Sequence, residues 1–289
     1  MNISRSRKGF TLIELLVVIS ILALLVAILM PALNRARQQA TSAVCLANQK
    51  SLILAWMMYE QEYEGSLPCG YIHEDLPNCW VYPPIDENGN DIGGAGDNVT
   101  HEDRLRGLRA GVLYEYLKNT DVYNCPGDNR WLKGSKRYGN SERYHMYRSY
   151  CISIGIAAIS EPGVKETDGY DLYNYTIHKS SEIRQPSEKY VFVEEAYDGQ
   201  SNYNFNDRSW SFYAYREAFW DPLALFHNDA TTLAFADGHA EMHRWEDDRT
   251  IQYFTNRNSG DRDTVGADNP DVHYMQRRFA HNYPDDPDM

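Results

Sequence analysis

Imidazole and carboxylate side chains are concentrated in a short segment near the C-terminus of this 289-residue chain. His239, Glu241 and His243 occupy alternate positions, so an extended strand would place all three on one face. Imidazole and carboxylate groups together can bind a divalent metal ion. Alternate polar residues of a hairpin more often form its solvent-facing side, so we expect no metal site on this strand.

His227 and Asp237 lie in the same segment and could act together as an acid–base pair. We favour a structural role, in which His227 hydrogen-bonds the end of a hairpin and Asp237 shapes its turn. The chain shows no nucleophile elbow, no HExxH sequence and no phosphate-binding loop. We therefore expect no catalytic residue and no enzymatic activity.

Two other sets of side chains leave alternatives open. Four carboxylates could offer oxygen ligands to a calcium ion, but no known calcium loop has their spacing: Asp168, Asp171, Asp198 and Asp207. We expect no cofactor and leave calcium as the open alternative. Two aromatic groups could stack on sugars or pack inside a sheet: Tyr170, Tyr173 and Tyr175, and Trp210, Phe212, Tyr213 and Tyr215.

The dipeptide Asp237-Gly238 separates two runs with strand character. This dipeptide is typical of a two-residue type I′ hairpin turn. Such a turn places Ala236 opposite His239 and Leu233 opposite Met242. In this register one hairpin face is apolar and the other is mainly polar, which supports the hairpin prediction.

The N-terminal segment has a different chemistry. Basic residues precede Gly9, and an apolar run over residues 10–33 contains a single acid, Glu14. At about 1.5 Å per residue a helix over this run spans about 35 Å, enough to cross a hydrocarbon core of about 30 Å. A secretory signal peptide has a shorter apolar core of about 7–15 residues. A plain anchor does not explain Glu14, because a carboxylate inside a membrane is costly and usually functional.

The helical pattern continues beyond the apolar run. Apolar residues recur at three- to four-residue intervals up to Met58, so we expect one helix from about residue 11 to 62. Pro31 should kink or loosen this helix, because proline removes one of its hydrogen bonds. Gly65 and Pro68 should end it. The second half should place its apolar stripe on a globular domain.

The remaining pattern predicts an α+β fold with a mainly antiparallel sheet. We expect strands at 150–159 and 189–195, a helix at 105–117 and a surface loop at 70–101. The expected organisation is a leader at 1–9, a membrane span at 10–33, an amphipathic helix extension at 34–62, an ectodomain at 63–258 and a polar, loosely attached tail at 259–289.

The acidic composition and the cysteines limit the partners and the cross-links. A net charge of −13 argues against nucleic acid as a partner. Five cysteines allow disulfides if the domain is translocated: Cys45, Cys69, Cys79, Cys125 and Cys151. Cys69 and Cys79 flank a short loop and are the favoured pair. No CxxC spacing occurs, so we expect no structural zinc site.

The segment from Lys8-Gly9 through Phe-Thr-Leu-Ile-Glu-Leu-Leu-Val-Val-Ile resembles the cleavage and methylation signal of type IV prepilins and type II secretion pseudopilins. The resemblance implies cleavage between Gly9 and Phe10 by a prepilin peptidase, which also N-methylates Phe10. It implies that Glu14 pairs with the N-terminal ammonium of a neighbouring subunit, and pilin-like proteins often carry a proline at the position of Pro31. It implies a single-pass protein of the bacterial inner membrane, with a cytoplasmic N-terminus and an extracytoplasmic C-terminal domain.

Nine residues separate His227 from Asp237-Gly238, a spacing that resembles the H-X9-DG signature of DUF1559-like pilin-like ectodomains. Together the two resemblances imply a structural subunit whose partners are the prepilin peptidase and other pilin or pseudopilin subunits. Assembly into a type IV pilus-like filament and into a type II secretion pseudopilus both remain open. The alternative is a membrane-tethered glycan- or protein-binding module that does not polymerise.

The mature chain is predicted to begin with N-methyl-Phe10, which mass spectrometry of the purified protein would detect. Replacing Gly9 with alanine or a bulkier residue should leave the precursor uncut, because the peptidase approaches the backbone closely at this position. Full processing of the Gly9 variants would contradict this assignment.

Overall fold

The computed structural model describes residues 12–72, 76–92, 99–128, 148–159, 176–196, 209–213, 218–219, 221–256, 265–266 and 268–281. The chain divides into two compact units, Met1–Thr41 and Ser42–Met289. Helix α1 (Leu12–Glu62) contributes residues to both units, as the sequence pattern predicts. The second unit adds an antiparallel sheet, which confirms the α+β fold class.

Within the first unit, α1 is mainly apolar from Leu12 to Leu33, and the side chains of this stretch are exposed. Its large apolar residues from Leu12 to Leu33 are each about half exposed or more. The helix continues through Pro31 without a break in its assignment. By length and composition it can cross a membrane.

Within the second unit, α1 buries one stripe of side chains: Cys45, Gln49, Leu52, Ile53, Ala55, Trp56 and Tyr59. The three- to four-residue spacing keeps these residues on one side of the helix. The helix ends before Gly65, whose φ of +84° suits glycine and whose N–H donates to the carbonyl of Glu60 at 2.8 Å.

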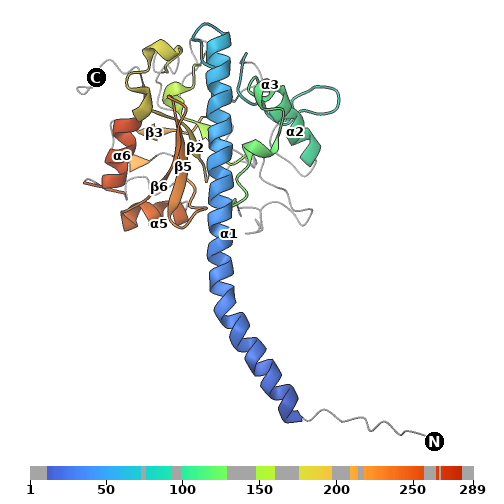
Figure 1. Cartoon of the computed structure of the whole chain (residues 1–289). Coiled ribbons are helices and arrows are strands. Elements are labelled where there is room, and N and C mark those ends of the chain that lie inside the picture. The colour runs from blue at the N-terminus through green and yellow to red at the C-terminus, as the bar shows by residue number, and fades with distance from the viewer. Residues whose placement is uncertain are drawn as a thin grey trace, which may run out of the picture. The chain divides into compact units, whose positions relative to one another are not determined.

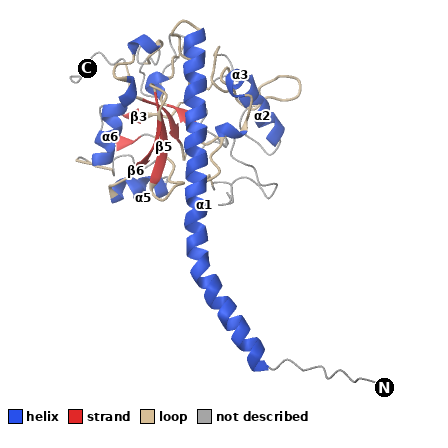
Figure 2. Ribbon diagram, viewed as in Figure 1, coloured by secondary structure: helices blue, strands red, loops and turns tan. Residues whose placement is uncertain are grey.

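The principal sheet has four antiparallel strands in the order β1-β2-β5-β6, drawn in red in Figure 2. Their bounds are β1 (Tyr150–Ile152), β2 (Tyr190–Glu194), β5 (Ala230–Phe235) and β6 (Ala240–Arg244). A second ribbon pairs β3 (Phe212–Tyr213) with β4 (Ala218–Phe219). The strand expected at 189–195 is confirmed. The strand expected at 150–159 ends early, because the chain turns into a 3₁₀ segment at Ile154–Ile156.

Both faces of this sheet are covered. On one face, Ala234 of β5 packs in a cluster with Leu52 and Trp56 of α1. On the other, Leu233 and Phe235 pack with residues of α5 (Asp248–Asn256) and α6 (Pro270–Arg278). Figure 1 shows α5 and α6 on the side of the sheet away from α1. Successive side chains of β5 therefore lie on opposite faces of the sheet and pack in two separate cores.

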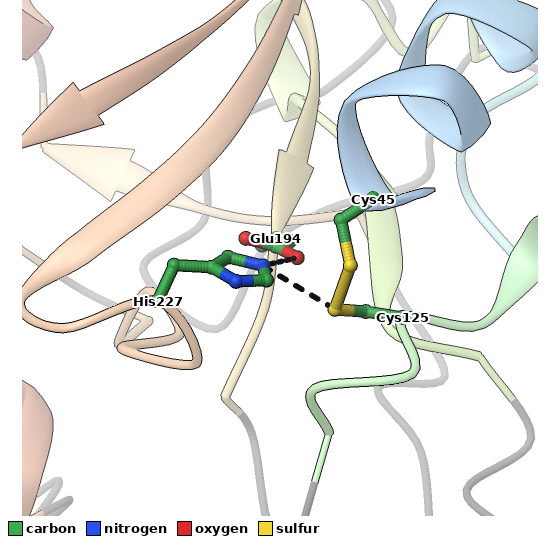
Figure 3. A group of neighbouring side chains, drawn as sticks. All are labelled: Cys45, Cys125, Glu194 and His227. Atoms are coloured by element: carbon green, nitrogen blue, oxygen red, sulfur yellow. Dashed lines mark hydrogen bonds and ion pairs between the residues drawn. A yellow bond between two sulfur atoms is a disulfide. The ribbon is translucent and has the colours of Figure 1, made fainter. Parts of the chain in front are cut away.

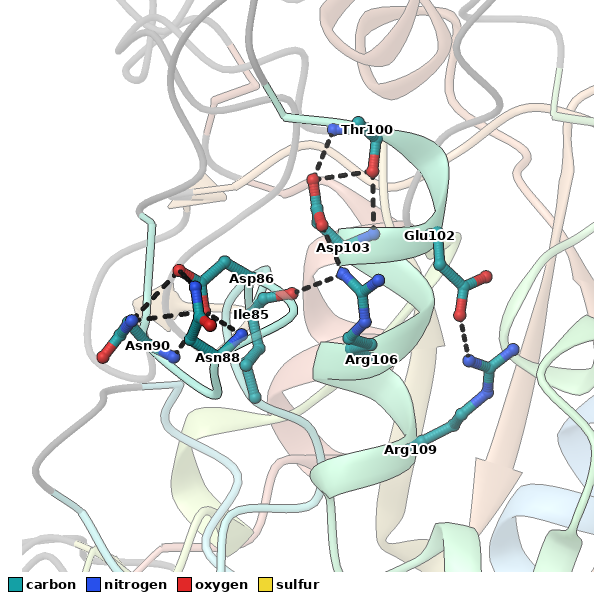
Figure 4. A network of polar contacts seen from close by, with 9 residues as sticks. All are labelled: Ile85, Asp86, Asn88, Asn90, Thr100, Glu102, Asp103, Arg106 and Arg109. Carbon is teal, nitrogen blue, oxygen red and sulfur yellow. Dashed lines mark hydrogen bonds and ion pairs between the residues drawn. The ribbon is translucent and has the colours of Figure 1, made fainter.

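The helix expected at 105–117 is two helices, α2 (His101–Ala110) and α3 (Tyr114–Leu117). They separate at Gly111, where a Cβ atom would lie 2.1 Å from the carbonyl oxygen of Trp80. Figure 4 shows how α2 begins. The Thr100 hydroxyl accepts a hydrogen bond from the N–H of Asp103, whose carboxylate accepts the N–H of Thr100 in return. Arg106 pairs with the same carboxylate.

The hairpin forms, but its predicted register is wrong by one residue. Leu233 lies opposite Glu241 and Thr232 lies opposite Met242. The N–H of Gly238 donates to the carbonyl of Phe235, and Gly238 has a φ of +92°. The loop thus has three residues rather than two, a type I turn followed by a left-handed glycine. Because both faces of β5 are buried, the separation of apolar from polar side chains could not identify this register.

The expectation of a loosely attached tail is wrong for the part that the structure describes. Val272, Met275 and Phe279 of this segment are at most 2% exposed. The buried carboxylate of Asp271 accepts hydrogen bonds from the N–H groups of Glu246 and Asp247. Polar composition misled the prediction, because a short helix needs only a few apolar residues on one side to pack.

Phe279→Ala should lower the free energy of unfolding of the second unit by about 3–5 kcal/mol, since it removes a ring from the core between β2 and β3. Chemical denaturation of the full chain in detergent would measure the change. Arg277→Ala, two residues away on the exposed side of α6, is the matched control and should change little. Equal stability of both variants would show that this segment is not part of the core.

Candidate functional site

A disulfide joins α1 to a distant loop of the second unit. It links Cys45 to Cys125, 80 residues further along the chain, with Cα atoms 5.3 Å apart. The favoured pairing of Cys69 with Cys79 is wrong. Both are thiols whose sulfur atoms face the carbonyl of Tyr71, at 3.4 and 3.1 Å. Loop closure favours near neighbours in sequence, but the packing of α1 decided the actual pair.

His227 lies against this disulfide, as Figure 3 shows. Its side chain is 1% exposed, and Nε2 lies 3.4 Å from the sulfur of Cys125 and 3.1 Å from Oε1 of Glu194. Nδ1 lies 3.1 Å from the hydroxyl of Ser42. His227 therefore joins α1, the Cys125 loop and β2, rather than the end of the hairpin.

Glu194 is fully buried at the end of β2. Its Oε1 lies within hydrogen-bond distance of Nε2 of His227, at 3.1 Å. The second oxygen, Oε2, accepts the backbone N–H of Thr232 at 2.8 Å. These two contacts compensate part of the cost of removing the carboxylate from water.

The arrangement of the four side chains Cys45, Cys125, Glu194 and His227 defines the candidate site. One ligand atom from each lies within 4.8 Å of the others, and all four residues are buried. The sequence pattern marks His227 but does not connect it to either cysteine or to Glu194. The four residues come from α1, a loop, β2 and the segment before β5, so no local spacing marks them.

Glu241 and His243 alternate along β6 and both contact Tyr274, whereas His239 directly precedes this strand and contacts Asp237. His239 contacts the carboxylate of Asp237 at 2.6 Å. Glu241 accepts a hydrogen bond from Tyr274, and burial followed by this bond raises the pKa of that tyrosine. The ring of His243 stacks on Tyr274 at 3.7 Å, and burial lowers the pKa of His243.

Asp237 and Gly238 have the turn geometry that their types favour. The carboxylate of Asp237 accepts the N–H of His239 at 3.1 Å, which closes the turn. Gly238 accepts a hydrogen bond through its carbonyl oxygen from Lys50 of α1. The signature His227–Asp237-Gly238 therefore consists of two positions that both touch α1, rather than one reactive centre.

The residues predicted for processing and assembly lie in the first unit. Gly9 and Phe10 are outside the described residues. Glu14 is in the first turn of α1, where a carboxylate is favoured by the helix dipole, and it is exposed in the single chain. Pro31 is inside the same helix.

Several predicted ligands and aromatic residues cannot be compared with the structure. The four carboxylates considered for calcium lie outside the described residues, as do the other aromatic candidates Tyr170, Tyr173, Tyr175 and Tyr215. Trp210 and Phe212 are described, and both are buried, with their rings stacked at 5.7 Å. These two residues pack in the core, as the sheet-packing alternative predicts.

Comparison with known proteins identifies the N-terminal segment. Residues 4–30 match the family described as the prokaryotic N-terminal methylation motif. A stretch of 56 residues is 46% identical to the type IV wide pilus major component PilA4 of Thermus thermophilus. This stretch is 19% of the present chain and 43% of that protein, so the chain spans less than half of the relative. No solved structure matches the chain.

These matches support a type IV prepilin-like protein, and with the apolar helix they indicate a single-pass membrane anchor. The matched motif includes Gly9, Phe10 and Glu14. It does not reach the ectodomain, whose signature at His227 and Asp237-Gly238 stays a prediction.

His227→Ala should destabilise the oxidised protein by about 3–5 kcal/mol, because it leaves the buried Glu194 carboxylate without the imidazole. Chemical denaturation in detergent would measure this loss. His239→Ala is the matched control, since it removes an imidazole that is 40% exposed and also contacts a carboxylate. An equal effect of the two substitutions would contradict a special role for the buried pair.

Proposed function

We propose that this protein is a structural subunit of a pilin-like filament. The precursor is inserted in the bacterial inner membrane with its N-terminus in the cytoplasm and its ectodomain outside. A prepilin peptidase removes residues 1–9 and methylates Phe10, and the mature subunits polymerise through their N-terminal helices. The filament is a type IV pilus-like fibre or a type II secretion pseudopilus.

The observation that carries this proposal is Glu14 in the first turn of an apolar, exposed helix. A plain anchor gains nothing from a carboxylate there, and insertion with it costs about 2.5–3.5 kcal/mol near mid-membrane. In a filament the same carboxylate lies beside the N-terminal ammonium of the next subunit. Two opposite charges tolerate an apolar environment much better together than apart.

Contacts within the second unit support the proposal that α1 holds the ectodomain to the filament. Residues 42–62 of α1 are attached to the ectodomain by three kinds of contact. These are the Cys45–Cys125 disulfide, the buried stripe from Cys45 to Tyr59, and the hydrogen bonds of His227 and Lys50. A subunit held in a filament by its helix needs such fastening, because force on the ectodomain passes through these residues.

The ectodomain is proposed to be of the DUF1559-like kind with the H-X9-DG signature, to form the outer surface and to lack catalytic activity and a cofactor. Its acidic charge supports partners other than nucleic acid. A membrane-tethered binding module shares the anchor and the ectodomain but not the polymerisation, so an assembly assay separates the two functions.

Glu14→Ala and Glu14→Gln should both reduce filament assembly by about tenfold or more while membrane insertion is kept, since the interaction with a neighbouring ammonium is lost. Sheared filaments would be quantified against total protein. Glu87→Ala removes an exposed acid of the ectodomain and is the control.

Cysteine crosslinking distinguishes the polymerising subunit from the membrane-tethered binding module. A cysteine introduced at Leu16 or at Leu24 should crosslink neighbouring subunits, and Glu14→Ala should abolish the crosslinks. The five native cysteines are all at most 2% exposed, so they add little background. If no crosslinks form, and the Glu14 variants match the wild type in membrane insertion and in the amount of sheared filament, the non-polymerising module is favoured.

A further inference from the structure

The buried site at Cys45, Cys125, Glu194 and His227 contains more polar chemistry than a disulfide needs. A disulfide is neutral and apolar, and its formation requires neither an imidazole nor a carboxylate. Glu194 is nevertheless completely buried, and its Oε1 faces Nε2 of His227 at 3.1 Å, beside the sulfur of Cys125. Such a buried carboxylate is costly unless it has a strong partner.

The four side chains together form a donor set suited to zinc. Two thiolates, one imidazole nitrogen and one carboxylate oxygen are common Zn²⁺ ligands. With bonds of about 2.0–2.3 Å, the donor atoms of a tetrahedral zinc site lie about 3.3–3.8 Å apart. Nε2 already lies 3.1 Å from the Glu194 oxygen and 3.4 Å from the Cys125 sulfur. The two sulfur atoms, which are bonded in the disulfide, must separate, and their Cα atoms are 5.3 Å apart.

We propose that the chain with Cys45 and Cys125 reduced binds one Zn²⁺ ion through these two thiolates, Nε2 of His227 and a carboxylate oxygen of Glu194. The disulfide and the zinc site are two exclusive states of the same residues. Neither state depends on filament assembly, so the proposal stands apart from the proposed function.

The chemistry balances in both directions. The newly synthesised chain carries two thiols at this site, and Zn²⁺ binding releases their two protons. From the disulfide, a dithiol reductant supplies two electrons and two protons, the S–S bond breaks, and the reductant becomes a disulfide. Oxidation by a disulfide-containing oxidant reverses this exchange and releases the ion.

Surrounding groups orient the ligands. When Nε2 binds the ion, Nδ1 carries the proton and donates to the hydroxyl of Ser42, which lies 3.1 Å away. The backbone N–H of Thr232 holds the second oxygen of Glu194 at 2.8 Å. Both contacts already exist in the oxidised structure, so the imidazole and the carboxylate need little movement.

The other thiols have different surroundings. Burial raises the pKa of Cys151, which opposes formation of a thiolate. Cys69 and Cys79 direct their sulfur atoms at the carbonyl of Tyr71. These three residues therefore serve as control positions for a zinc-binding experiment.

The test uses the full chain in detergent micelles, reduced with a water-soluble phosphine. The phosphine takes the oxygen of one water molecule, and the two protons go to the sulfurs. Zinc binding is measured by competition with a chromogenic chelator, and Co²⁺ is added as a spectroscopic substitute. We expect one ion per reduced chain, release of two protons, and the absorption bands of tetrahedral Co²⁺ with thiolate ligands. The oxidised chain should bind no ion at this site.

Variants identify the ligands. Cys45→Ser and Cys125→Ser should abolish the Co²⁺ bands, and His227→Ala and Glu194→Gln should weaken zinc binding more than about tenfold. A triple variant with serine at Cys69, Cys79 and Cys151 should bind as the wild type does. The proposal is overturned if the reduced wild type binds no ion, if binding is unchanged in His227→Ala, or if the triple variant loses it. The wild-type spectrum decides even where a variant fails to fold.

Discussion

The packing of residues 42–62 of α1 against one face of the sheet β1-β2-β5-β6 is the contact on which the second unit depends. This part of the helix buries Leu52, Ile53 and Trp56 in the cluster that also contains Ala234 of β5. The same stripe brings Gln49 to the carbonyl of Thr232 and Cys45 to Cys125. Without the helix, this face of the sheet would be exposed to water, at a cost of about 25 cal/mol for each square ångström of apolar surface.

The polar residues in this interface follow from the same packing. His227 reaches Ser42 of α1 and Glu194 of β2 because both elements pass the start of β5. Buried polar groups require partners, so each of these side chains restricts the position of the others. The centre that makes the helix–sheet contact specific is also the centre whose donor atoms suit a metal ion when the disulfide is open.

The two units place different demands on one helix. In the first unit, α1 carries apolar residues on all sides from Leu15 to Leu33, as a helix in lipid or among copies of itself must. In the second unit, α1 has a buried stripe and an exposed polar side, as a helix on a sheet must have. Glu14 departs from the first pattern and Gln49 from the second. Each is a polar group placed where an apolar one would be expected. Gln49 has its partner at Thr232 of β5, far away in the sequence, and the partner that we propose for Glu14 belongs to another subunit.

The sequence alone determined the long helix, the α+β class, β2, the hairpin and the type IV prepilin-like N-terminal segment, because each depends on periodicity or on contiguous residues. It did not determine the hairpin register, since both faces of β5 are buried and either register covers apolar side chains. The disulfide and the attachment of Phe279 also required the tertiary structure. Cys45, Cys125, Glu194 and His227 are brought together only by the packing of α1 on the sheet, and no pattern within one segment encodes a contact that four separate segments make.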